Sequence, residues 1–283
     1  MEMKTECVDA PVYTRDGSLA RAELVARPNR FLAIARLDSG IREACADEAE
    51  LGEVRAHIAD PGRLEELLFP GAIVYLARAR AGNTRTPRKT GYDLVLVEHN
   101  GILVSVDSRV PNELVYRALK SGFFEELREY KRITRESTYG SSRFDFRLSS
   151  GNADEPDAAP STETPDCFVE VKSVTLIQDS VALFPDAPTA RGARHMRELA
   201  TAISQGFRAM AIFVIQREDA ECFAPNAAMD PGFAEALRTA ASAGVKVTAM
   251  KCDIARSGAI MLSEAVPVIL HSSTPHPEQP NTQ

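Results

Sequence analysis

The sequence lacks the features that mark membrane, secreted and zinc-binding proteins. No apolar run in its 283 residues approaches the roughly 18 residues that a membrane span requires, so we expect no membrane partner. Residues 1–6 show no basic start followed by an apolar stretch, and we expect no signal peptide. The five cysteines are odd in number, scattered and without CxxC spacing, which is typical of reduced thiols rather than disulfides. These absences favour a cytoplasmic globular protein.

Familiar catalytic motifs are missing as well. The sequence contains no glycine-rich phosphate loop, no nucleophile elbow and no cysteine–histidine pairing signature, and it has no internal repeat. His57, His99 and His195 lie far apart in the chain, and we expect each to be a satisfied polar residue rather than a metal ligand. Any catalytic chemistry therefore has to come from a different constellation.

The net charge of −7 argues at first against a nucleic-acid partner. Two acidic segments, 38–53 and 149–166, supply more than the whole of this negative charge, so the rest of the chain is net positive. Basic clusters remain around residues 78–89 and 128–135. Such clusters permit phosphate binding, and an ordinary solvated surface is the alternative reading.

The first third of the chain reads as short strands. Apolar runs at 31–37, 54–58 and 72–79 are separated by the turn Asp60-Pro61-Gly62 and by one or two possible helical turns over 63–68. We predict an OB-like β-barrel over residues 1–85, a barrel type that binds nucleic acids.

The pattern changes over residues 86–266. Asn100-Gly101 is a hairpin signal, and a helix opens at Pro111 and stops at Gly122. The later elements alternate in type: strands near 132–136, 143–148 and 168–174, a helix near 196–206, a strand at 209–215, a helix near 233–241 and a strand at 245–250. This order predicts a three-layer α/β domain (α+β mixed) with a mixed sheet. We expect residues 267–283 to be a disordered tail, and no pattern specifies an oligomeric state.

Two of these strands carry charges where buried strands should not. Asp145 stands between two phenylalanines, and Phe168-Val169-Glu170-Val171-Lys172 follows across a polar loop. Because side chains alternate along a strand, Glu170 and Lys172 emerge on one face. If the two strands pair, Asp145, Glu170 and Lys172 converge on one spot of the sheet. We expect these three residues to be catalytic, with Asp145 and Glu170 as ligands of Mg²⁺ or Mn²⁺.

Competing readings of these charges stay open. Glu-x-Lys occurs three times in the chain, and Glu170 and Lys172 could simply neutralise each other as an ion pair at a strand edge. Asp166 is four residues from Glu170 on the same strand, roughly 13 Å away at about 3.3 Å per residue, which is too far to share a cation. Glu136 is a possible extra acid, although a surface role suits it better.

The chemistry that such a trio performs is phosphodiester hydrolysis. Two carboxylates hold a cation whose charge activates a water and stabilises the transition state at phosphorus. Lys172 would position or deprotonate the water and offset charge on the phosphate.

Seven motifs then occur in an order that resembles one known family. They are RPNRF (27–31), HIADPGR (57–63), RKT (88–90), SRFDF (142–146), EVKSVTL (170–176), FPDA (184–187) and TARG (189–192). Together they resemble the sugar fermentation stimulation protein A family of bacteria and archaea over nearly all of residues 24–250. The resemblance implies an OB-fold domain, a PD-(D/E)XK nuclease-like domain, DNA binding without evident sequence preference, and a link to the regulation of sugar use, maltose metabolism included.

The resemblance also implies residue roles. Asp145, Glu170 and Lys172 match the acidic and lysine positions of the nuclease-type site. The residues expected to contact DNA are Arg27, Asn29, Arg30, Arg63, Arg88, Lys89 and Arg143. We expect the basic members of the first domain to face a common groove, with solvated surface charge as the alternative.

Three functions fit these observations. The first is a DNA-binding protein with a Mg²⁺-dependent phosphodiesterase site. The second is an active DNA endonuclease, and the third is a protein-interaction regulator that keeps the fold and uses neither activity.

Overall fold

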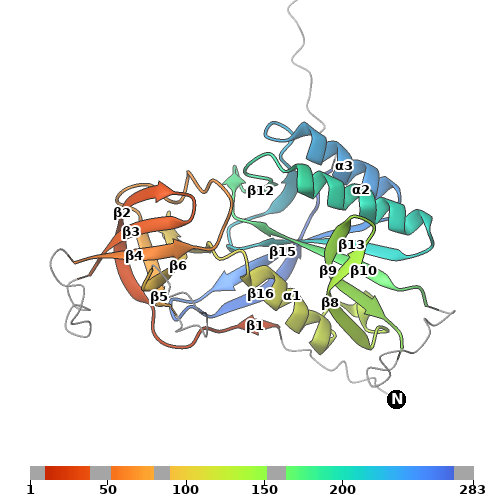
Figure 1. Ribbon diagram of the computed structural model, residues 1–283, viewed down its shortest axis with the longest axis horizontal. Helices are drawn as coiled ribbons and strands as arrows, with labels where there is room; N and C mark the ends of the chain where they lie inside the picture. The colour runs from red at the N-terminus through yellow and green to blue at the C-terminus, as the bar shows by residue number, and fades with distance from the viewer. Residues whose placement is uncertain (1–9, 39–51, 80–89, 152–163, 271–283) are drawn as a thin grey trace, which may run out of the picture.

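The computed structural model describes residues 10–38, 52–79, 90–151 and 164–270. Within these ranges a β-barrel lies beside a larger α/β part, at the left and the right of Figure 1. The predicted combination of an OB-type barrel and a three-layer α/β domain with a mixed sheet is confirmed. The predicted DNA contacts Arg88 and Lys89 fall outside the described residues.

The barrel is built from consecutive antiparallel strands closed by one parallel pairing. Its strands are β2 (Ala20–Asn29), β3 (Leu32–Leu37), β4 (Glu53–Ile58), β5 (Ile73–Arg78), β6 (Tyr92–His99) and β7 (Ile102–Ser105), in the spatial order β4-β3-β2-β5-β6-β7. Strand β4 also pairs with β6, which closes five strands into a barrel. Inward-facing residues alternate along the strands, as in β3, where Ala33, Ala35 and Leu37 are buried.

Two features of the barrel differ from expectation. Strands β6 and β7, which the sequence analysis grouped with the second domain, hydrogen-bond to β5 and to each other and so belong to the barrel. Closure by the β4–β6 pairing leaves the barrel no free edge there, and such a long-range pairing gives no local signal. The expected helical turns over 63–68 are a single hydrogen-bonded turn, in which Leu68 N–H bonds the carbonyl of Leu64 at 2.8 Å.

The α/β part is a seven-stranded sheet covered by helices on both faces. Its strands, in spatial order, are β1 (Val12–Tyr13), β16 (Ile260–Val266), β15 (Lys246–Ile254), β13 (Arg208–Ile215), β10 (Cys167–Val174), β9 (Ser142–Ser149) and β8 (Arg132–Tyr139). The central strands β10, β13 and β15 are parallel, and the outer strands are antiparallel. A small second sheet contains β11 (Ile177–Gln178), β12 (Val181–Phe184) and β14 (Cys222–Pro225).

Helix α1 (Val110–Ser121) covers one face of the large sheet, and α2 (Ala190–Ser204) and α3 (Pro231–Ser242) cover the other (Figure 1). A short 3₁₀ helix, η2 (Glu125–Leu127), follows α1. Each face has its own apolar core: Leu114 and Val115 of α1 pack against one side of β10 and β13, and Met196 and Leu199 of α2 pack with α3 against the other. Local sequence fixes where the helices begin, because the Thr189 hydroxyl accepts from Gly192 N–H and Asp230 caps α3.

The chain end stays attached to this domain further than expected. Val268 forms a bridge with Phe223, and Ile269 N–H bonds the Phe223 carbonyl at 2.8 Å. Residues 267–270 are therefore part of the fold, and residues 271–283 lie outside the described part of the chain. No helix in the described ranges is both long and apolar enough to cross a membrane.

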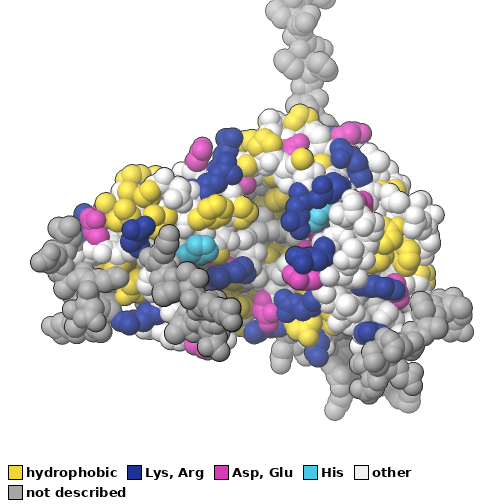
Figure 2. Space-filling model, viewed as in Figure 1, with side chains coloured by type: hydrophobic (Ala, Val, Ile, Leu, Met, Phe, Trp, Pro, Cys, Tyr) yellow, Lys and Arg dark blue, Asp and Glu magenta, His cyan; other side chains and the backbone are white. Residues whose placement is uncertain are grey.

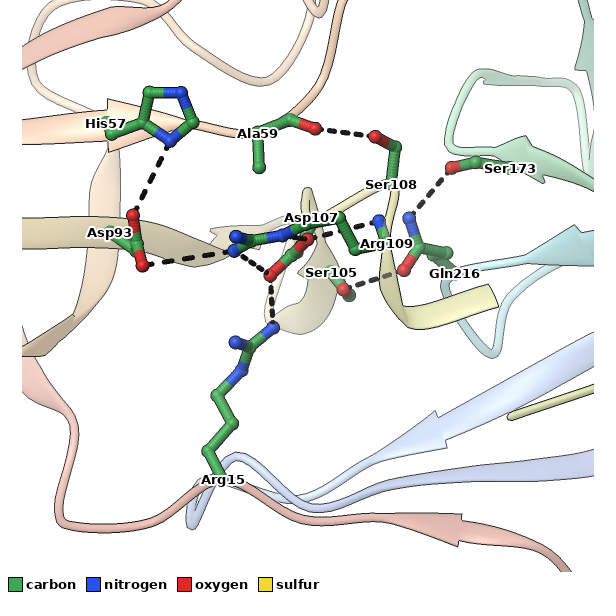
Figure 3. A network of polar contacts seen from close by, with 10 residues as sticks. All are labelled: Arg15, His57, Ala59, Asp93, Ser105, Asp107, Ser108, Arg109, Ser173 and Gln216. Carbon is green, nitrogen blue, oxygen red and sulfur yellow. Dashed lines mark hydrogen bonds and ion pairs between the residues drawn. The ribbon is translucent and has the colours of Figure 1, made fainter. Parts of the chain in front are cut away.

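A buried polar network joins the barrel to the α/β part (Figure 3). The Asp107 carboxylate, 1% exposed, accepts from Arg15 and Arg109 at 2.7–2.8 Å, and these ion pairs outweigh burial and hold its pKa below the ordinary value. Beside it, the Ser105 hydroxyl donates to Gln216, whose amide donates to Ser173. This network fixes the end of β7 against the strands that carry the site.

Candidate active site in the cleft between the barrel and the sheet

Asp145 lies on β9, and Glu170 and Lys172 lie on the neighbouring β10. The two strands pair antiparallel, but their regular ladder stops one residue short of Asp145. At that point the Asp145 carboxylate takes the place of a backbone carbonyl as the acceptor: its Oδ2 accepts the N–H of Val171 at 2.8 Å. The structure thus brings the predicted trio together on adjacent strands.

Strand β9 is irregular at Asp145, which has no register partner on β8 or β10. Residues two apart on a regular strand share a face, yet Phe146 packs in the core beneath α1 and Phe144 in the core beneath α2 and α3. The Asp145 side chain therefore lies at the point where the strand changes face. Its second oxygen, Oδ1, accepts from the Asn112 amide at 2.7 Å, so the first turn of α1 helps to hold it.

Glu170 is almost completely buried, with 3% of its side chain exposed. One oxygen, Oε1, accepts from Lys172 Nζ at 2.5 Å and contacts Nδ1 of His195 on α2. The other, Oε2, is buried and has no hydrogen-bond partner among the described residues. An orphaned buried oxygen costs roughly 1–3 kcal/mol, so a ligand that engages Oε2 would recover that cost.

The two carboxylates have opposite pKa shifts. Burial raises the pKa of Asp145, and the negative charge of Glu170 raises it further. Burial alone would also raise the pKa of Glu170, but Lys172 and His195 outweigh it and hold that pKa below the ordinary value. Glu170 is therefore the more firmly ionised of the pair.

The ion pair between Glu170 and Lys172, kept open as an alternative reading, is present in the structure. It does not lie at a sheet edge, because β10 is flanked by β9 and β13. Both residues instead line the floor of a cleft of about 530 Å³ between the barrel and the α/β part. The ion pair with Lys172 gives Oε1 of Glu170 a partner, but it leaves Oε2 without one among the described residues.

The opposite wall of the cleft comes from the turn after β4 and the loop before α2. Asp60 and Asp186 approach each other across Gly62, where an added Cβ would lie 2.8 Å from Asp60 Oδ1 and 2.5 Å from Asp186 Oδ2. Asp186 Oδ2 accepts the N–H of Arg63 at 2.7 Å, and this hydrogen bond links the α/β part to the barrel. Burial raises the pKa of Asp60 to about 6.

The residues predicted to contact DNA separate into two groups. Arg30 is exposed and lines the cleft, and Arg63 is exposed on the adjoining turn. Arg27 turns inward, where its guanidinium donates to the carbonyls of Arg30, Gly62 and Arg63.

Two further members of that set are engaged locally. Asn29 Oδ1 accepts the N–H of Phe31 at 2.9 Å and so shapes the β2–β3 turn. Arg143 is exposed away from the cleft lining and pairs at 3.5 Å with Glu136, which has the surface position expected for it. Asp166, excluded on distance, pairs with Arg147.

Helix α2 contributes functional candidates that the sequence analysis missed. His195 contacts Glu170, although we expected it to be only a satisfied polar residue. Arg191, Arg194 and Arg197 are exposed at a spacing of three, and none forms an ion pair with a carboxylate of the described ranges. In Figure 2 several Lys and Arg side chains of the viewed face border the middle of the molecule, between the barrel and α2, and others lie toward its two ends. These residues could have been recognised in the sequence from the spacing Arg191-x-x-Arg194-His195, in the helix that follows the TARG motif.

The donor set fits a hard divalent cation. The described residues contain no group of three or more His, Cys, Asp or Glu side chains that could hold a metal ion, so the protein offers at most two such ligands here. Mg²⁺ commonly uses only one or two carboxylates and keeps several waters, which suits Asp145 and Glu170: both residues line the cleft, and Glu170 Oε2 has no hydrogen-bond partner among the described residues.

Fold and site together define a two-domain protein with an OB-type barrel and an acidic–lysine site at the junction with a three-layer α/β domain. The models described as "SfsA N-terminal OB domain" and "Sugar fermentation stimulation protein RE domain" match residues 25–106 and 109–258. The chain belongs to the sugar fermentation stimulation protein family.

Relatives agree with this assignment. The sugar fermentation stimulation protein homolog of Moorella thermoacetica is 48% identical over 238 residues, which cover 84% of this chain and 91% of that protein. The homolog of Chloroflexus aurantiacus is 42% identical, covering 88% and 85%. The solved structure of Pyrococcus furiosus SfsA in complex with Ca²⁺ has a TM-score of 0.75 and 28% identity, covering 91% of this chain and 98% of that one.

Proposed function

We propose that this protein binds DNA in the cleft, largely independently of sequence, and that Asp145, Glu170 and Lys172 form a Mg²⁺- or Mn²⁺-dependent phosphodiesterase site on the cleft floor. The observation that carries the proposal is the convergence of these three side chains on an open cleft beside exposed arginines. From the family membership and the resemblance of the seven motifs we also propose a role in regulating sugar use, maltose included. A cytoplasmic location suits the free thiols of Cys167 and Cys252.

The arginines supply the argument for a phosphate backbone. Arg30 of the barrel and Arg191 of α2 both line the cleft, and Arg194 and Arg197 extend the positive surface along the helix. Guanidinium groups pair with phosphate through two parallel hydrogen bonds. Contacts to phosphates carry no sequence information, which supports binding that is largely independent of sequence.

The floor residues supply the argument for hydrolysis. Asp145 and Glu170 Oε2 would hold the cation, which when bound supplies the charge that activates a water and offsets charge on the phosphate. An ammonium has three N–H donors; Lys172 gives one to Glu170 and has two for a phosphate oxygen or a water. The Pyrococcus furiosus relative was solved with Ca²⁺, another cation that prefers oxygen ligands.

DNA binding is tested by fluorescence anisotropy with a labelled duplex across a salt series. The logarithm of the affinity should fall linearly with the logarithm of salt, and Arg30→Ala or Arg191→Ala should make that slope shallower by about one phosphate contact each. Arg36→Ala, at an exposed arginine of β3 outside the cleft lining and outside the predicted DNA contacts, serves as the matched control and should leave the slope unchanged. A flat salt response in the wild-type protein would refute DNA binding.

Hydrolysis is tested with linear, circular and branched DNA in Mg²⁺ or Mn²⁺. Asp145→Asn and Glu170→Gln should abolish cutting and leave DNA affinity intact or improved, because each removes a negative charge from the cleft. Glu136→Gln, an exposed carboxylate outside the cleft, should cut normally. A wild-type protein that cuts none of these substrates would remove the enzymatic half of the proposal and leave a DNA-binding regulator.

A further inference from the structure

His195 of α2 is buried, with a partner at each ring nitrogen. Only 2% of the residue is exposed, and the ring of Phe144 packs edge-on against it at 6.0 Å. Its Nδ1 contacts Glu170 Oε1, and its Nε2 lies 3.3 Å from Nε of Arg191, one helical turn earlier.

These two contacts determine the tautomer of His195. Arginine has only N–H donors at its guanidinium and keeps its proton, so Arg191 Nε donates and His195 Nε2 must accept. The ring proton is therefore on Nδ1, from which it is donated to Glu170 Oε1. Glu170, an ionised carboxylate that can only accept, and Arg191, which can only donate, therefore fix the same tautomer from opposite sides of the ring.

The consequence for Glu170 is an unequal use of its two oxygens. Oε1 receives two donors, His195 Nδ1 and Lys172 Nζ, whereas Oε2 receives none among the described residues. Two donors converging on one oxygen restrict rotation of the carboxylate. With Lys172 alone, the carboxylate could rotate and exchange its oxygens.

We propose that His195 is a positioning residue: held in its Nδ1–H tautomer between Glu170 and Arg191, it orients Glu170 so that Oε2 is presented to a divalent cation. This inference rests on the metal site of the proposed function. Hydrogen-bond partners of metal ligands commonly change affinity by about 10–100-fold when they are removed. A purely structural role for His195 would change stability and leave the metal affinity intact.

Two amide substitutions separate these possibilities. In His195→Asn the side-chain amide lies near the position of Nδ1 and can still donate to Glu170, whereas in His195→Gln it lies near Nε2 and cannot. Mn²⁺ affinity is measured by isothermal titration calorimetry or electron paramagnetic resonance on the full-length protein without DNA. We expect His195→Asn to remain within about threefold of wild type and His195→Gln to lose about 10–100-fold. Equal Mn²⁺ affinity in folded His195→Gln and wild type overturns the inference, whereas no Mn²⁺ binding by the wild type overturns the proposed metal site itself.

A second measurement needs no substitution in the buried ring. Nitrogen NMR of protein labelled at histidine distinguishes the two tautomers, and His195 should show a protonated Nδ1 in the wild type. An Nε2–H signal in the wild type overturns the inference even where His195→Gln does not fold.

Discussion

Asp60 offers the sharpest test of how the cleft is built. Its side chain follows β4, is 7% exposed, and accepts the N–H of Gly62 at 2.7 Å. Burial is the main cause that raises its pKa from an ordinary 3.8 to about 6, and the charge of Asp186 adds to it. The folded protein therefore binds a proton to Asp60 more tightly than the unfolded chain does.

The sign of the pH dependence follows from this difference. The contribution of Asp60 to stability is fully present below about pH 3.8 and is lost as the pH rises through about 6. Each pKa unit corresponds to about 1.36 kcal/mol, so the whole effect is about 3 kcal/mol. The substitution Asp60→Asn keeps an oxygen that can accept from Gly62 and removes the charge. We expect it to raise the free energy of unfolding at pH 8 by up to about 3 kcal/mol, with a difference near zero below about pH 4.

The measurement is urea denaturation of wild type and Asp60→Asn at intervals from pH 4 to 8. Other carboxylates, such as Asp107 with its lowered pKa, change stability in the opposite direction, and subtracting the two curves removes their effect. Glu65→Gln, at an exposed neighbour on the same turn, is the control and should change the stability at pH 8 much less than Asp60→Asn does. A flat curve for Asp60→Asn, or a variant that is less stable than wild type at pH 8, would refute the reasoning.

Two further outcomes follow from a half-buried arginine and from two buried cysteines. Arg27→Met should lower the free energy of unfolding by about 1–3 kcal/mol in thermal denaturation, because the Arg27 guanidinium donates to three backbone carbonyls. Arg30→Met, the control, should lower it by less than about 0.5 kcal/mol. Equal losses in the two variants would contradict the bracing role of Arg27. Burial raises the pKa of the Cys167 thiol to about 12 and also raises that of Cys252. Iodoacetamide at pH 8 should therefore leave both thiols unmodified in the folded protein and modify both in urea, as measured by peptide mass spectrometry. Rapid labelling of either cysteine in the folded protein would show that it is not buried.

The site strands could be predicted because their signal is local. Strand periodicity placed Glu170 and Lys172 on one face, and the phenylalanines around Asp145 marked a charge inside an apolar strand. The two-domain architecture followed in the same way from turns and periodic runs. What local patterns could not give was the membership of β6 in the barrel, which depends on pairing with β4 across more than thirty residues.

The directions of individual side chains could not be predicted from the sequence either. Arg27 and Arg30 are three residues apart and chemically alike, yet one braces the turn at Gly62 and the other lines the cleft. His195 reaches Glu170 only because α2 packs over β10, and no spacing in the sequence relates the two residues. Partners of this kind are set by packing between distant elements, which a periodic pattern does not encode.

The polar link between the barrel and β10 gives the last prediction. Gln216 is fully buried, accepts from the Ser105 hydroxyl at 2.8 Å and donates to the Ser173 hydroxyl at 2.9 Å (Figure 3). Gln216→Met preserves the volume but leaves the fully buried Ser105 hydroxyl without this acceptor, whereas the half-buried Ser173 can turn to water. We expect a loss of about 1–3 kcal/mol in the free energy of unfolding.

The double substitution Gln216→Met with Ser105→Ala distinguishes a hydrogen bond from simple packing. Removing both partners removes the orphaned hydroxyl, so the double variant should be about as stable as Gln216→Met alone or more stable. Gln205→Met is the matched control, because Gln205 makes an exposed hydrogen bond to Tyr139. If Ser105→Ala adds its full separate cost to that of Gln216→Met in chemical denaturation, the two side chains are not coupled. The junction would then be held by Asp107 and its arginines and by the backbone bond from Ser105 N–H to the Gln216 carbonyl.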